Sequence, residues 1–446
     1  MKKIENFKLL NIFFVGIGGI SMSGLCKISK FLGAKVQGSD LGFNEETEKL
    51  ETDGVKIYHK HNASNITPSI NLVVFSGAIH SDNPEIQRAK QLGIKVIERS
   101  KFLGIIAGLF KHVVAISGTH GKTTTTAMIG EILHSSGLNP TIHIGGESIN
   151  LKDNTIIGAN DLIVLEACEY RESFRYLKPS ILVITNIESD HLDYFKNINN
   201  IYRAFYKLSR KSKFLIKAKN NKINHKNSSV INKNYVAKNI KFINFGYTFD
   251  VYKDNVYLDT FRLNMMGDYN VQNALFAISS CIKLGVSLDK IKLALANFKG
   301  VKRRNEIISF IKKTPVIIDY AHHPTEIKES LKGAFSVYQN PLVIFQPHTY
   351  SRTLKLFDEF LNVLKVENIV VFKTYPAREN EIIGGRAIDL FEKLDVKNKH
   401  YFEDIFKLKN YIAKTTEKEN PQAILVLGAG DLAENLRKEL NNNSKN

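Results

Sequence analysis

The chain has 446 residues and 43% of them are hydrophobic, which is enough for about two to four domains with buried cores. No apolar run reaches the roughly 18 residues of a membrane span, and the N-terminus lacks the apolar segment and cleavage site of a signal peptide. The three cysteines, Cys26, Cys168 and Cys281, are scattered without C-x-x-C spacing, which excludes a disulfide framework and a structural zinc site. We therefore expect a cytoplasmic protein without a membrane span.

The formal net charge is +18, and most of the excess is lysine. The densest stretch, residues 207–241, contains no acidic residue and few aromatic residues that could stack on bases. We interpret it as a solvated lysine-rich surface and expect no nucleic-acid partner. Small anionic substrates would also suit the charge.

The first 107 residues alternate between strand and helix patterns, which predicts a Rossmann-like domain. An apolar run leads into Gly16-Ile17-Gly18-Gly19, and Asp40 follows about twenty residues later. Ser21 stands where a dinucleotide fingerprint needs its third glycine, so the loop indicates a nucleotide or phosphate at a helix N-terminus without establishing NAD. A tight turn without a ligand is the alternative. Strands are expected at residues 12–15, from Val36, and at 55–58, 72–75 and 95–97, with helices over 20–32 and from Pro84.

Residues 113–126 read VVAISGTHGKTTTT and have the order of a phosphate-binding loop: buried strand, glycine-bearing loop, Lys-Thr, helix. Glycines let backbone N–H groups surround phosphate oxygens, and the helix N-terminus adds its positive dipole end. Lys122 would bring a charge to the β- and γ-phosphates, and Thr123 a hydroxyl to Mg²⁺. We expect Lys122 to face solvent when no ligand is bound. Ala115 replaces the first glycine of the strict pattern.

Two further strands are predicted in the same region, at residues 162–165 and 181–184. The first leads to Glu166, and the second to Asp190 and His191. Since carboxyl ends of parallel strands share one sheet edge, these side chains should meet the phosphate loop. A carboxylate and a threonine hydroxyl are usual Mg²⁺ ligands. A strand-end carboxylate that merely caps a helix is the alternative for Glu166.

The segment after Gly267 predicts a helix that reaches Ile282, with Asn270 and Asn273 on one face. These amides would read an adenine edge or cap the helix, and the local sequence does not decide between the two. Residues 300–304 then predict an interdomain connection with the pair Arg303-Arg304, whose guanidinium groups suit phosphate.

The last third of the chain predicts another α/β unit, whose strands at 316–318, 342–345, 369–372 and 424–427 each end in polar residues. His322 and His323 follow Asp319-Tyr320-Ala321, while His348 and Arg352 follow the next strand. The segment from Tyr375 to Glu379 follows the third strand. We expect residues 441–446 to be disordered.

Together these motifs resemble the Mur ligase family over nearly the whole chain. The resemblance rests on six motifs: the loop 16–24, Gly118-Thr119-His120-Gly121-Lys122-Thr123, the run Glu166-Ala167-Cys168-Glu169-Tyr170-Arg171, the pair Asp190-His191, the run from Tyr320 to Ile327, and Phe345-Gln346-Pro347-His348. The resemblance implies an α/β fold of three domains: a Rossmann-like N-terminal domain, a central P-loop ATPase-like parallel-sheet domain, and a Rossmann-like C-terminal domain. Residues 1–107 would bind a UDP-sugar, residues 108–301 ATP, and residues 302–446 an amino acid.

The resemblance further implies an ATP- and Mg²⁺-dependent ligase of peptidoglycan synthesis with the substrates UDP-N-acetylmuramate, L-alanine and ATP. The alternative is the ligase that attaches a recycled tripeptide to the same sugar nucleotide. Carried over residue by residue, the catalytic set would be Lys122, His191, His348 and Arg352; the ATP-binding set Gly118, Thr119, His120, Gly121, Lys122, Thr123, Thr124, Asn270, Asn273, Arg304 and Asp319; the substrate-binding set Gly18, Gly19, Ser39, Asp40, Ser76, His191, His322 and Arg352; and the metal set Thr123, Glu166 and His191.

Three positions depart from this family pattern. Thr349 stands where many relatives have arginine, Tyr269 where histidine is frequent, and Asn305 where an aromatic residue is common. The base that deprotonates the amino acid remains open among His348, His322 and Asp319, and so does the oligomeric state. A nicotinamide dehydrogenase would leave the phosphate loop, Glu166 and the third domain unexplained. A nucleic-acid-dependent ATPase, which the charge suggests, would show ATPase activity that DNA or RNA stimulates and salt suppresses.

Overall fold

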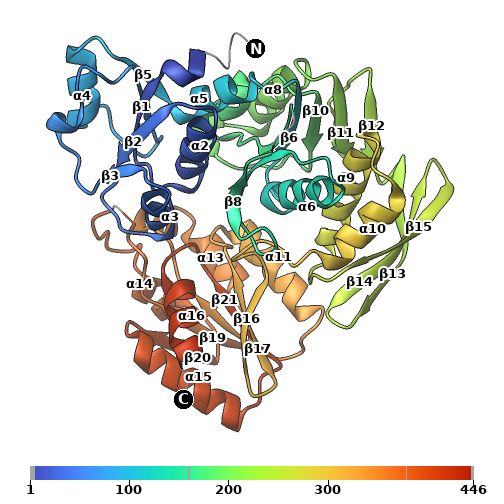
Figure 1. Cartoon of the computed structure of the whole chain (residues 1–446). Coiled ribbons are helices and arrows are strands. Elements are labelled where there is room, and N and C mark those ends of the chain that lie inside the picture. The colour runs from blue at the N-terminus through green and yellow to red at the C-terminus, as the bar shows by residue number, and fades with distance from the viewer. Residues whose placement is uncertain (1–5, 159–160, 378, 443–446) are drawn as a thin grey trace. The chain divides into compact units, whose positions relative to one another are not determined.

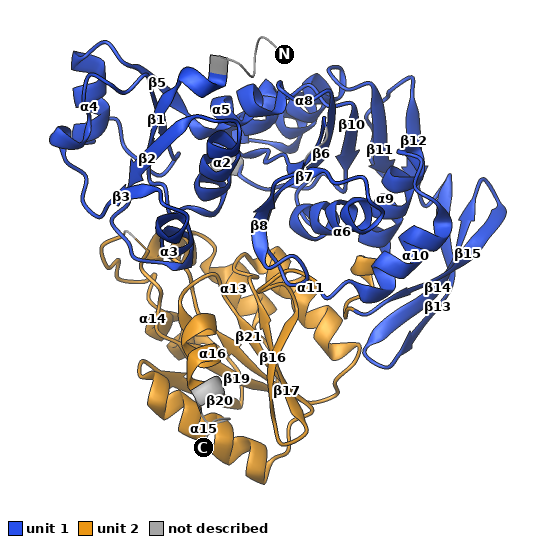
Figure 2. Cartoon of the chain, viewed as in Figure 1, with its two compact units in different colours: residues 1–264, 271–299 blue, residues 265–270, 300–446 orange. Residues whose placement is uncertain are grey.

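The computed structural model describes residues 6–158, 161–377 and 379–442 (Figure 1). The N-terminal start, Arg378 after the third strand of the last unit, and residues 443–446 of the tail expected to be disordered lie outside the described residues. The chain divides into two compact units, Met1–Asn264 with Val271–Lys299 and Met265–Asn270 with Gly300–Asn446 (Figure 2). No helix within the described ranges is long and apolar enough to cross a membrane.

The first sheet of unit 1 has five parallel strands in the order β3-β2-β1-β4-β5, with helices in the connections. Its central strand is buried along nearly its whole length, as a parallel strand covered on both faces requires. The expected strands are confirmed. The elements are η1 (Asn6–Leu9), β1 (Asn11–Val15), α2 (Ile20–Phe31), β2 (Lys35–Ser39), α3 (Glu45–Thr52), β3 (Lys56–Tyr58), η2 (Ala63–Asn65), β4 (Leu72–Phe75), α4 (Pro84–Gln91), β5 (Lys95–Glu98) and α5 (Arg99–Ala107).

The second sheet of unit 1 has ten strands in the order β15-β14-β13-β12-β11-β10-β6-β9-β7-β8. Its centre is parallel, so the carboxyl ends of β6, β9 and β10 lie at one edge. The elements are β6 (His112–Ser117), α6 (Lys122–Ser135), β7 (Thr141–Ser148), β8 (Asp153–Ile156), β9 (Leu162–Glu166), η3 (Tyr170–Tyr176), β10 (Ile181–Ile184), α7 (Leu192–Phe195), α8 (Ile198–Ser209), β11 (Phe214–Ala218), β12 (Ser228–Ile231), β13 (Tyr235–Ile243), β14 (Gly246–Lys253), β15 (Val256–Leu263), α9 (Tyr269–Lys283) and α10 (Leu288–Asn297).

The outer part of this sheet corrects the interpretation of the lysine-rich stretch. Residues 207–241 are not only a solvated surface, since they contain β11, β12 and the start of β13, with Leu215, Ile216 and Ile231 fully buried. Strands β13, β14 and β15 then form an antiparallel meander, which the sequence analysis did not predict. Four apolar residues of β14 and β15, namely Phe249, Val251, Phe261 and Leu263, are fully buried, and β15 packs against α10. Ile240, Phe242 and Ile243 of β13 are exposed.

The two sheets of unit 1 share one hydrophobic core, which includes Phe102 and Phe14 near the first sheet and Ala115 and Phe174 in the second. A polar contact also connects the two sheets of unit 1. The Lys27 ammonium lies 2.6 Å from the Asp153 carboxylate, linking α2 to β8. Helix α2 approaches β7 and β8 closely because it carries Gly24, where a Cβ would lie 2.1 Å from the Thr155 hydroxyl.

Unit 2 contains a six-stranded sheet in the order β16-β17-β21-β18-β19-β20, parallel except for the hairpin of β16 and β17. Helices pack on both faces, each over its own apolar core. Four of the six strands, β17, β18, β19 and β21, are those predicted from the sequence, whereas β16 and β20 were not predicted. The elements are β16 (Glu306–Ile311), β17 (Thr314–Asp319), α11 (Pro324–Phe335), β18 (Pro341–Phe345), α12 (Tyr350–Lys355), α13 (Phe357–Val363), β19 (Asn368–Phe372), α14 (Ala387–Lys393), β20 (Asn398–Phe402), α15 (Ile405–Lys418), β21 (Ala423–Leu427) and α16 (Leu432–Asn442).

Candidate active site

The phosphate loop joins β6 to α6, as the sequence predicts, and its two glycines are required by the local geometry. Gly118 has φ +136°, and a Cβ there would lie 2.1 Å from the Thr185 hydroxyl oxygen. Gly121 has φ +80°, and a Cβ would lie 2.6 Å from Oδ1 of Asn273. No side chain of the described residues caps the N-terminus of α6, so the N–H groups of its first turn are available to an external anion.

The end of β10 holds this loop in place from the neighbouring strand. The His120 N–H donates to Oδ1 of Asn186 at 2.8 Å, and the Thr185 hydroxyl donates to the His120 carbonyl at 2.6 Å. The Thr119 hydroxyl accepts from the Glu188 N–H at 3.0 Å. These bonds fix the loop before any ligand arrives, which reduces the entropy lost on binding.

Lys122 does not face solvent, which corrects the expectation from sequence. Its ammonium donates to the carbonyls of Gly118 and Thr119 at 2.6 and 3.0 Å and to the Glu169 carboxylate at 3.1 Å, and its side chain is only 14% exposed. Burial by itself lowers the pKa of Lys122, but the attraction of Glu169 and further groups outweighs it and raises this pKa above its usual value. Lys122 is therefore charged and held within its own loop.

Thr123 and Glu166 meet at the same edge, as predicted. The Thr123 hydroxyl donates to Oε2 of Glu166 at 2.9 Å, and the Gly145 N–H donates to the same oxygen at 3.1 Å. A hydroxyl and a carboxylate in contact are a suitable donor set for Mg²⁺. Thr124, in the same first turn of α6, is buried.

His191 lies beside Glu169 and Asp190 rather than in contact with Thr123 and Glu166. Its Nε2 is 3.9 Å from Oε1 of Glu169 and 3.7 Å from Oδ2 of Asp190, and its ring packs against Tyr170 at 4.6 Å. Ligand atoms of Glu169, Asp190 and His191 all lie within 4.8 Å of one another, which is compatible with a cation. Sequence reasoning assigned no role to Glu169, although the buried strand before it placed it at this edge.

The glycine loop of the first sheet is anchored by Asp40. Oδ2 of Asp40 accepts from the Gly18 N–H at 2.9 Å, and Oδ1 accepts from the Gly42 N–H at 3.1 Å. Gly19, which is exposed, precedes α2 without a side-chain cap. The carboxylate is thus bound to backbone, whereas a dinucleotide fingerprint would direct it to a ribose.

The two serines predicted near this loop have different surroundings. Ser39 is fully buried, and its hydroxyl donates to Glu85 at 2.7 Å and lies 3.0 Å from Nδ1 of His61. Ser76 is half-buried at the end of β4, beside the glycine loop at Gly16. Only Ser76 keeps a partly exposed side chain for a ligand.

In unit 2, His322, His348 and Arg352 gather at the carboxyl ends of β17 and β18. The two imidazole rings are 5.8 Å apart. Nη1 of Arg352 donates to Nδ1 of His348 at 3.1 Å, whereas Nδ1 of His322 lies 2.9 Å from the Tyr320 carbonyl. Burial, with His322 and Arg352 nearby, lowers the pKa of His348 to about 4; burial also lowers the pKa of His322. Both imidazoles are therefore neutral at neutral pH.

The carboxylate of Asp319, also at the end of β17, is hydrogen-bonded to backbone N–H groups. It is buried, and its two oxygens accept from the N–H groups of Ala321 at 2.8 Å and Asn305 at 3.0 Å. Burial raises the pKa of Asp319 to about 6, although Arg304 opposes the shift. The Arg303 and Arg304 guanidinium groups lie over the Tyr320 ring, at 4.8 and 5.2 Å from its centre.

The two asparagines of α9, Asn270 and Asn273, have different surroundings. The Asn270 amide donates to the Met266 carbonyl at 2.6 Å and is buried, which is a local cap, whereas Asn273 faces Gly121 of the phosphate loop. The first residue of α9, Tyr269, receives a hydrogen bond on its hydroxyl from Asn305. Two of the three departures from the family pattern are therefore partners in space.

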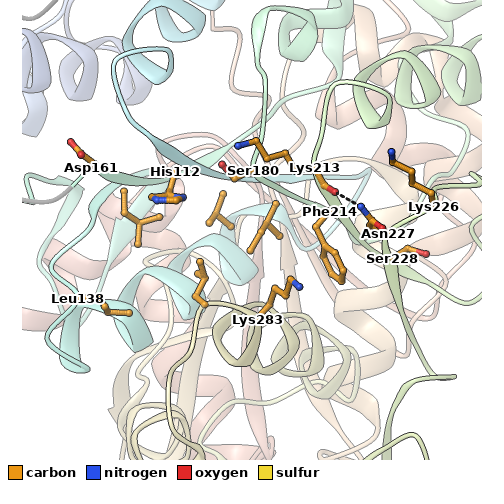
Figure 3. Close-up of a pocket in the computed structure, with 14 residues that line it drawn as sticks. His112, Leu138, Asp161, Ser180, Lys213, Phe214, Lys226, Asn227, Ser228 and Lys283 are labelled. Carbon is orange, nitrogen blue, oxygen red and sulfur yellow. Dashed lines mark hydrogen bonds between the residues drawn. The ribbon is translucent and has the colours of Figure 1, made fainter. Parts of the chain in front are cut away.

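A cavity of about 970 Å³ lies at the opposite edge of the ten-stranded sheet, where β6, β9, β10 and β11 begin (Figure 3). His112, Phe214 and three lysines, Lys213, Lys226 and Lys283, are among its lining residues. None of the predicted site residues lines it, so this cavity is separate from the phosphate loop.

The fold and these groups define a class: an α/β enzyme with a phosphate-binding loop and an acid–hydroxyl pair beside it, followed by a further α/β unit. Comparison with known families is more specific. The chain matches the Mur ligase family catalytic domain at residues 11–111, the Mur ligase middle domain at 116–281, and the Mur ligase glutamate ligase domain at 303–430. The chain belongs to the Mur ligase family.

Individual relatives agree with this assignment. A UDP-N-acetylmuramate–L-alanine ligase from Acetivibrio thermocellus is 40% identical over 95% of this chain and 94% of its own length. The crystal structure of a UDP-N-acetylmuramate–alanine ligase from Thermotoga maritima aligns with a TM-score of 0.83 and 29% identity, covering 98% of this chain and 99% of that one. A murein peptide ligase from Psychrobacter arcticus shares the fold, with a TM-score of 0.71 and 24% identity over 97% and 98% of the two chains.

Proposed function

We propose that the protein is an ATP-dependent ligase that joins L-alanine to the lactyl carboxylate of UDP-N-acetylmuramate in peptidoglycan synthesis. The observation that carries the proposal is the 40% identity to a ligase of this name over 94% of that relative's length. The phosphate loop, with Thr123 and Glu166 in contact beside it, supplies the matching chemistry. The cytoplasm, where both ATP and the sugar nucleotide are made, is the compartment that fits this reaction.

The first step transfers the γ-phosphoryl group of ATP to the lactyl carboxylate, giving an acyl phosphate and ADP. This step brings anions together, so the site must supply positive charge. Lys122 supplies one charge, and the N–H groups of the phosphate loop supply further donors. Bound Mg²⁺ would offset the charge of the triphosphate; Thr123 and Glu166 would hold it, with His191 as the third residue of the set.

In the second step the amine of L-alanine attacks the acyl carbon and phosphate leaves, so the amine must lose a proton. Of the three candidate bases, the geometry favours His322. Its Nδ1 faces the Tyr320 carbonyl, so Nδ1 carries the hydrogen and Nε2 is the basic nitrogen. The basic nitrogen of His348 instead accepts a hydrogen bond from Arg352, and Asp319 accepts two backbone N–H groups.

Under the same proposal, the remaining predicted residues would bind the substrates or hold the loops that bind them. Arg352 would hold the alanine carboxylate through the donors that do not contact His348. Gly18, Gly19 and Ser76 would contact the UDP-sugar, with Asp40 and Ser39 holding the loop from behind. Of the predicted ATP-binding residues, those of the phosphate loop and Asn273 belong to unit 1 and would contact the nucleotide. Asn270, Arg304 and Asp319 belong to unit 2, and their part in ATP binding stays a prediction.

The test offers the full chain ATP, Mg²⁺ and UDP-N-acetylmuramate, adds single amino acids or the tripeptide L-alanyl-γ-D-glutamyl-diaminopimelate, and measures phosphate. L-Alanine should give the largest phosphate release. Release with the tripeptide alone would replace this proposal with the tripeptide ligase. Release that needs no sugar nucleotide would refute both assignments.

A further inference from the structure

All three hydrogens of the Lys122 ammonium have acceptors inside the protein: the Gly118 carbonyl, the Thr119 carbonyl and the Glu169 carboxylate. An ammonium has only three donors, so none is left for a phosphate oxygen. Lys122 must therefore give up at least one of these partners before it can contact a nucleotide. Glu169 is the only one of the three partners that carries a charge.

Glu169 itself is in a rigid position. Its side chain is 4% exposed, and its backbone carbonyl accepts from the Glu172 N–H at 2.8 Å. Arg171 and Glu172 have φ +51°, so the chain reverses sharply directly after Glu169. Phe174 then anchors the turn, buried against Phe205 with 5.2 Å between the ring centres.

Lys122, in contrast, reaches Glu169 through a flexible four-carbon chain. Movement of the lysine is therefore easier than movement of the glutamate when an anion enters the loop. Oε2 of Glu169 has no hydrogen-bond donor among the described residues, although Nζ of Lys122 lies 3.1 Å away. The carboxylate thus depends on the lysine for its charge balance, and it competes with any incoming phosphate for the same ammonium.

We propose that Glu169 is a positioning residue that holds Lys122 against the phosphate loop and competes with the nucleotide for it. This contact lowers the affinity for nucleotide and speeds the release of ADP. The inference rests on the proposed function only in that the loop binds ATP and ADP. It assigns Glu169 a role distinct from metal binding, which Thr123 and Glu166 carry in the proposal above.

The experiment measures binding of a fluorescent ADP, the N-methylanthraniloyl derivative, to the full chain in EDTA and again in Mg²⁺. In EDTA, Glu169→Gln should bind the probe about fivefold to tenfold more tightly, a change that corresponds to loss of one competing charge contact. Stopped-flow dissociation should slow by a similar factor. A merely structural role would not produce such a gain. Glu172→Gln, in the same turn with the same loss of charge, is the matched control and should change neither value.

Glu169→Asp keeps the charge but lengthens the contact, so its affinity should lie between those of the wild type and Glu169→Gln. It also serves as the test if the glutamine variant fails to fold, which thermal unfolding would show. Unchanged or weaker binding in EDTA by these variants would overturn the inference. Binding weakened only in Mg²⁺ would overturn it as well and would make Glu169 a metal ligand. A wild-type chain that binds neither probe nor ATP would refute the proposed function instead.

Discussion

Arg352 donates a hydrogen bond from Nη1 to Nδ1 of His348 at 3.1 Å, and this bond distinguishes two histidines that look equivalent in the sequence. A neutral imidazole that accepts at Nδ1 carries its hydrogen on Nε2. Its one basic nitrogen is therefore turned toward a cation. His322 has the opposite arrangement, since its Nδ1 faces the Tyr320 carbonyl at 2.9 Å and the Glu326 carboxylate at 3.4 Å.

The first prediction follows for the amine base. His322→Gln should lower the rate of L-alanine-dependent phosphate release by about 10²–10⁴-fold, the usual contribution of a general base. Burial lowers the pKa of His322, so the wild-type rate should fall only when the pH drops below about 6.5. This acid limb should persist in His348→Gln. A pH–rate profile of each variant decides the matter, and loss of the acid limb in His348→Gln would assign the base to His348.

The second prediction concerns the Lys122–Glu169 pair. Lys122→Ala should reduce turnover by about 10²–10³-fold, because the transferred phosphoryl group loses one charge contact. It should also destabilise the fold by about 3 kcal/mol, because Glu169 becomes a buried carboxylate without a counterion. The double variant Lys122→Ala with Glu169→Gln should recover thermal stability but not activity. Equal melting temperatures for the wild type and Lys122→Ala would contradict this account of the buried pair.

The third prediction concerns the metal set. Glu166→Gln keeps the shape of the side chain and removes its charge, so the Mg²⁺ concentration for half-maximal activity should rise by about tenfold or more. The hydrogen bonds from Thr123 and Gly145 can still be accepted by the amide oxygen, so the fold should be retained. Glu172→Gln again serves as the control. A magnesium titration that matches the wild type would leave Glu166 as a structural acceptor only.

The fourth prediction concerns the pH dependence of stability that His143 contributes between the two sheets of unit 1. His143 is buried between the hydroxyls of Ser21 and Thr155, at 2.9 and 3.0 Å, and burial lowers its pKa from 6.5 to about 3. The unfolded chain therefore binds this proton more readily, so the stability contribution is complete above pH 6.5 and is lost as the pH falls toward 3. The slope is up to about 1.4 kcal/mol per pH unit.

Thermal unfolding at pH 7.5 and 5.0 tests this, with His143→Gln as the comparison. The wild type should lose more stability between the two pH values than the variant. Glu131 contributes the opposite sign, since burial raises its pKa from 4.5 to about 7, so only the difference between the two proteins isolates His143. Equal losses in both would show that His143 is not the group that titrates.

The sequence by itself determined the features that depend on neighbours along the chain. A strand, a glycine-bearing loop and Lys-Thr predicted the phosphate loop at Gly118–Thr123, because the backbone requirements of that loop are local. Polar residues after buried strands predicted that Glu166, His322 and His348 lie at sheet edges. The three-domain α/β fold followed from the same alternation. The meander of β13 to β15 was missed because its apolar face is defined only by what it packs on.

The tertiary structure alone decided which groups meet and in what chemical form. Glu169 lies 47 residues from Lys122, and its carboxylate fixes the lysine that the sequence placed in solvent. The departures Tyr269 and Asn305 proved to be hydrogen-bond partners across 36 positions. Hydrogen-bond partners also assign the basic nitrogens of His322 and His348. Sequence spacing specifies which residues reach an edge of a sheet, whereas rotamers, burial and partners from distant segments set charge and orientation, and these arise only when the chain has packed.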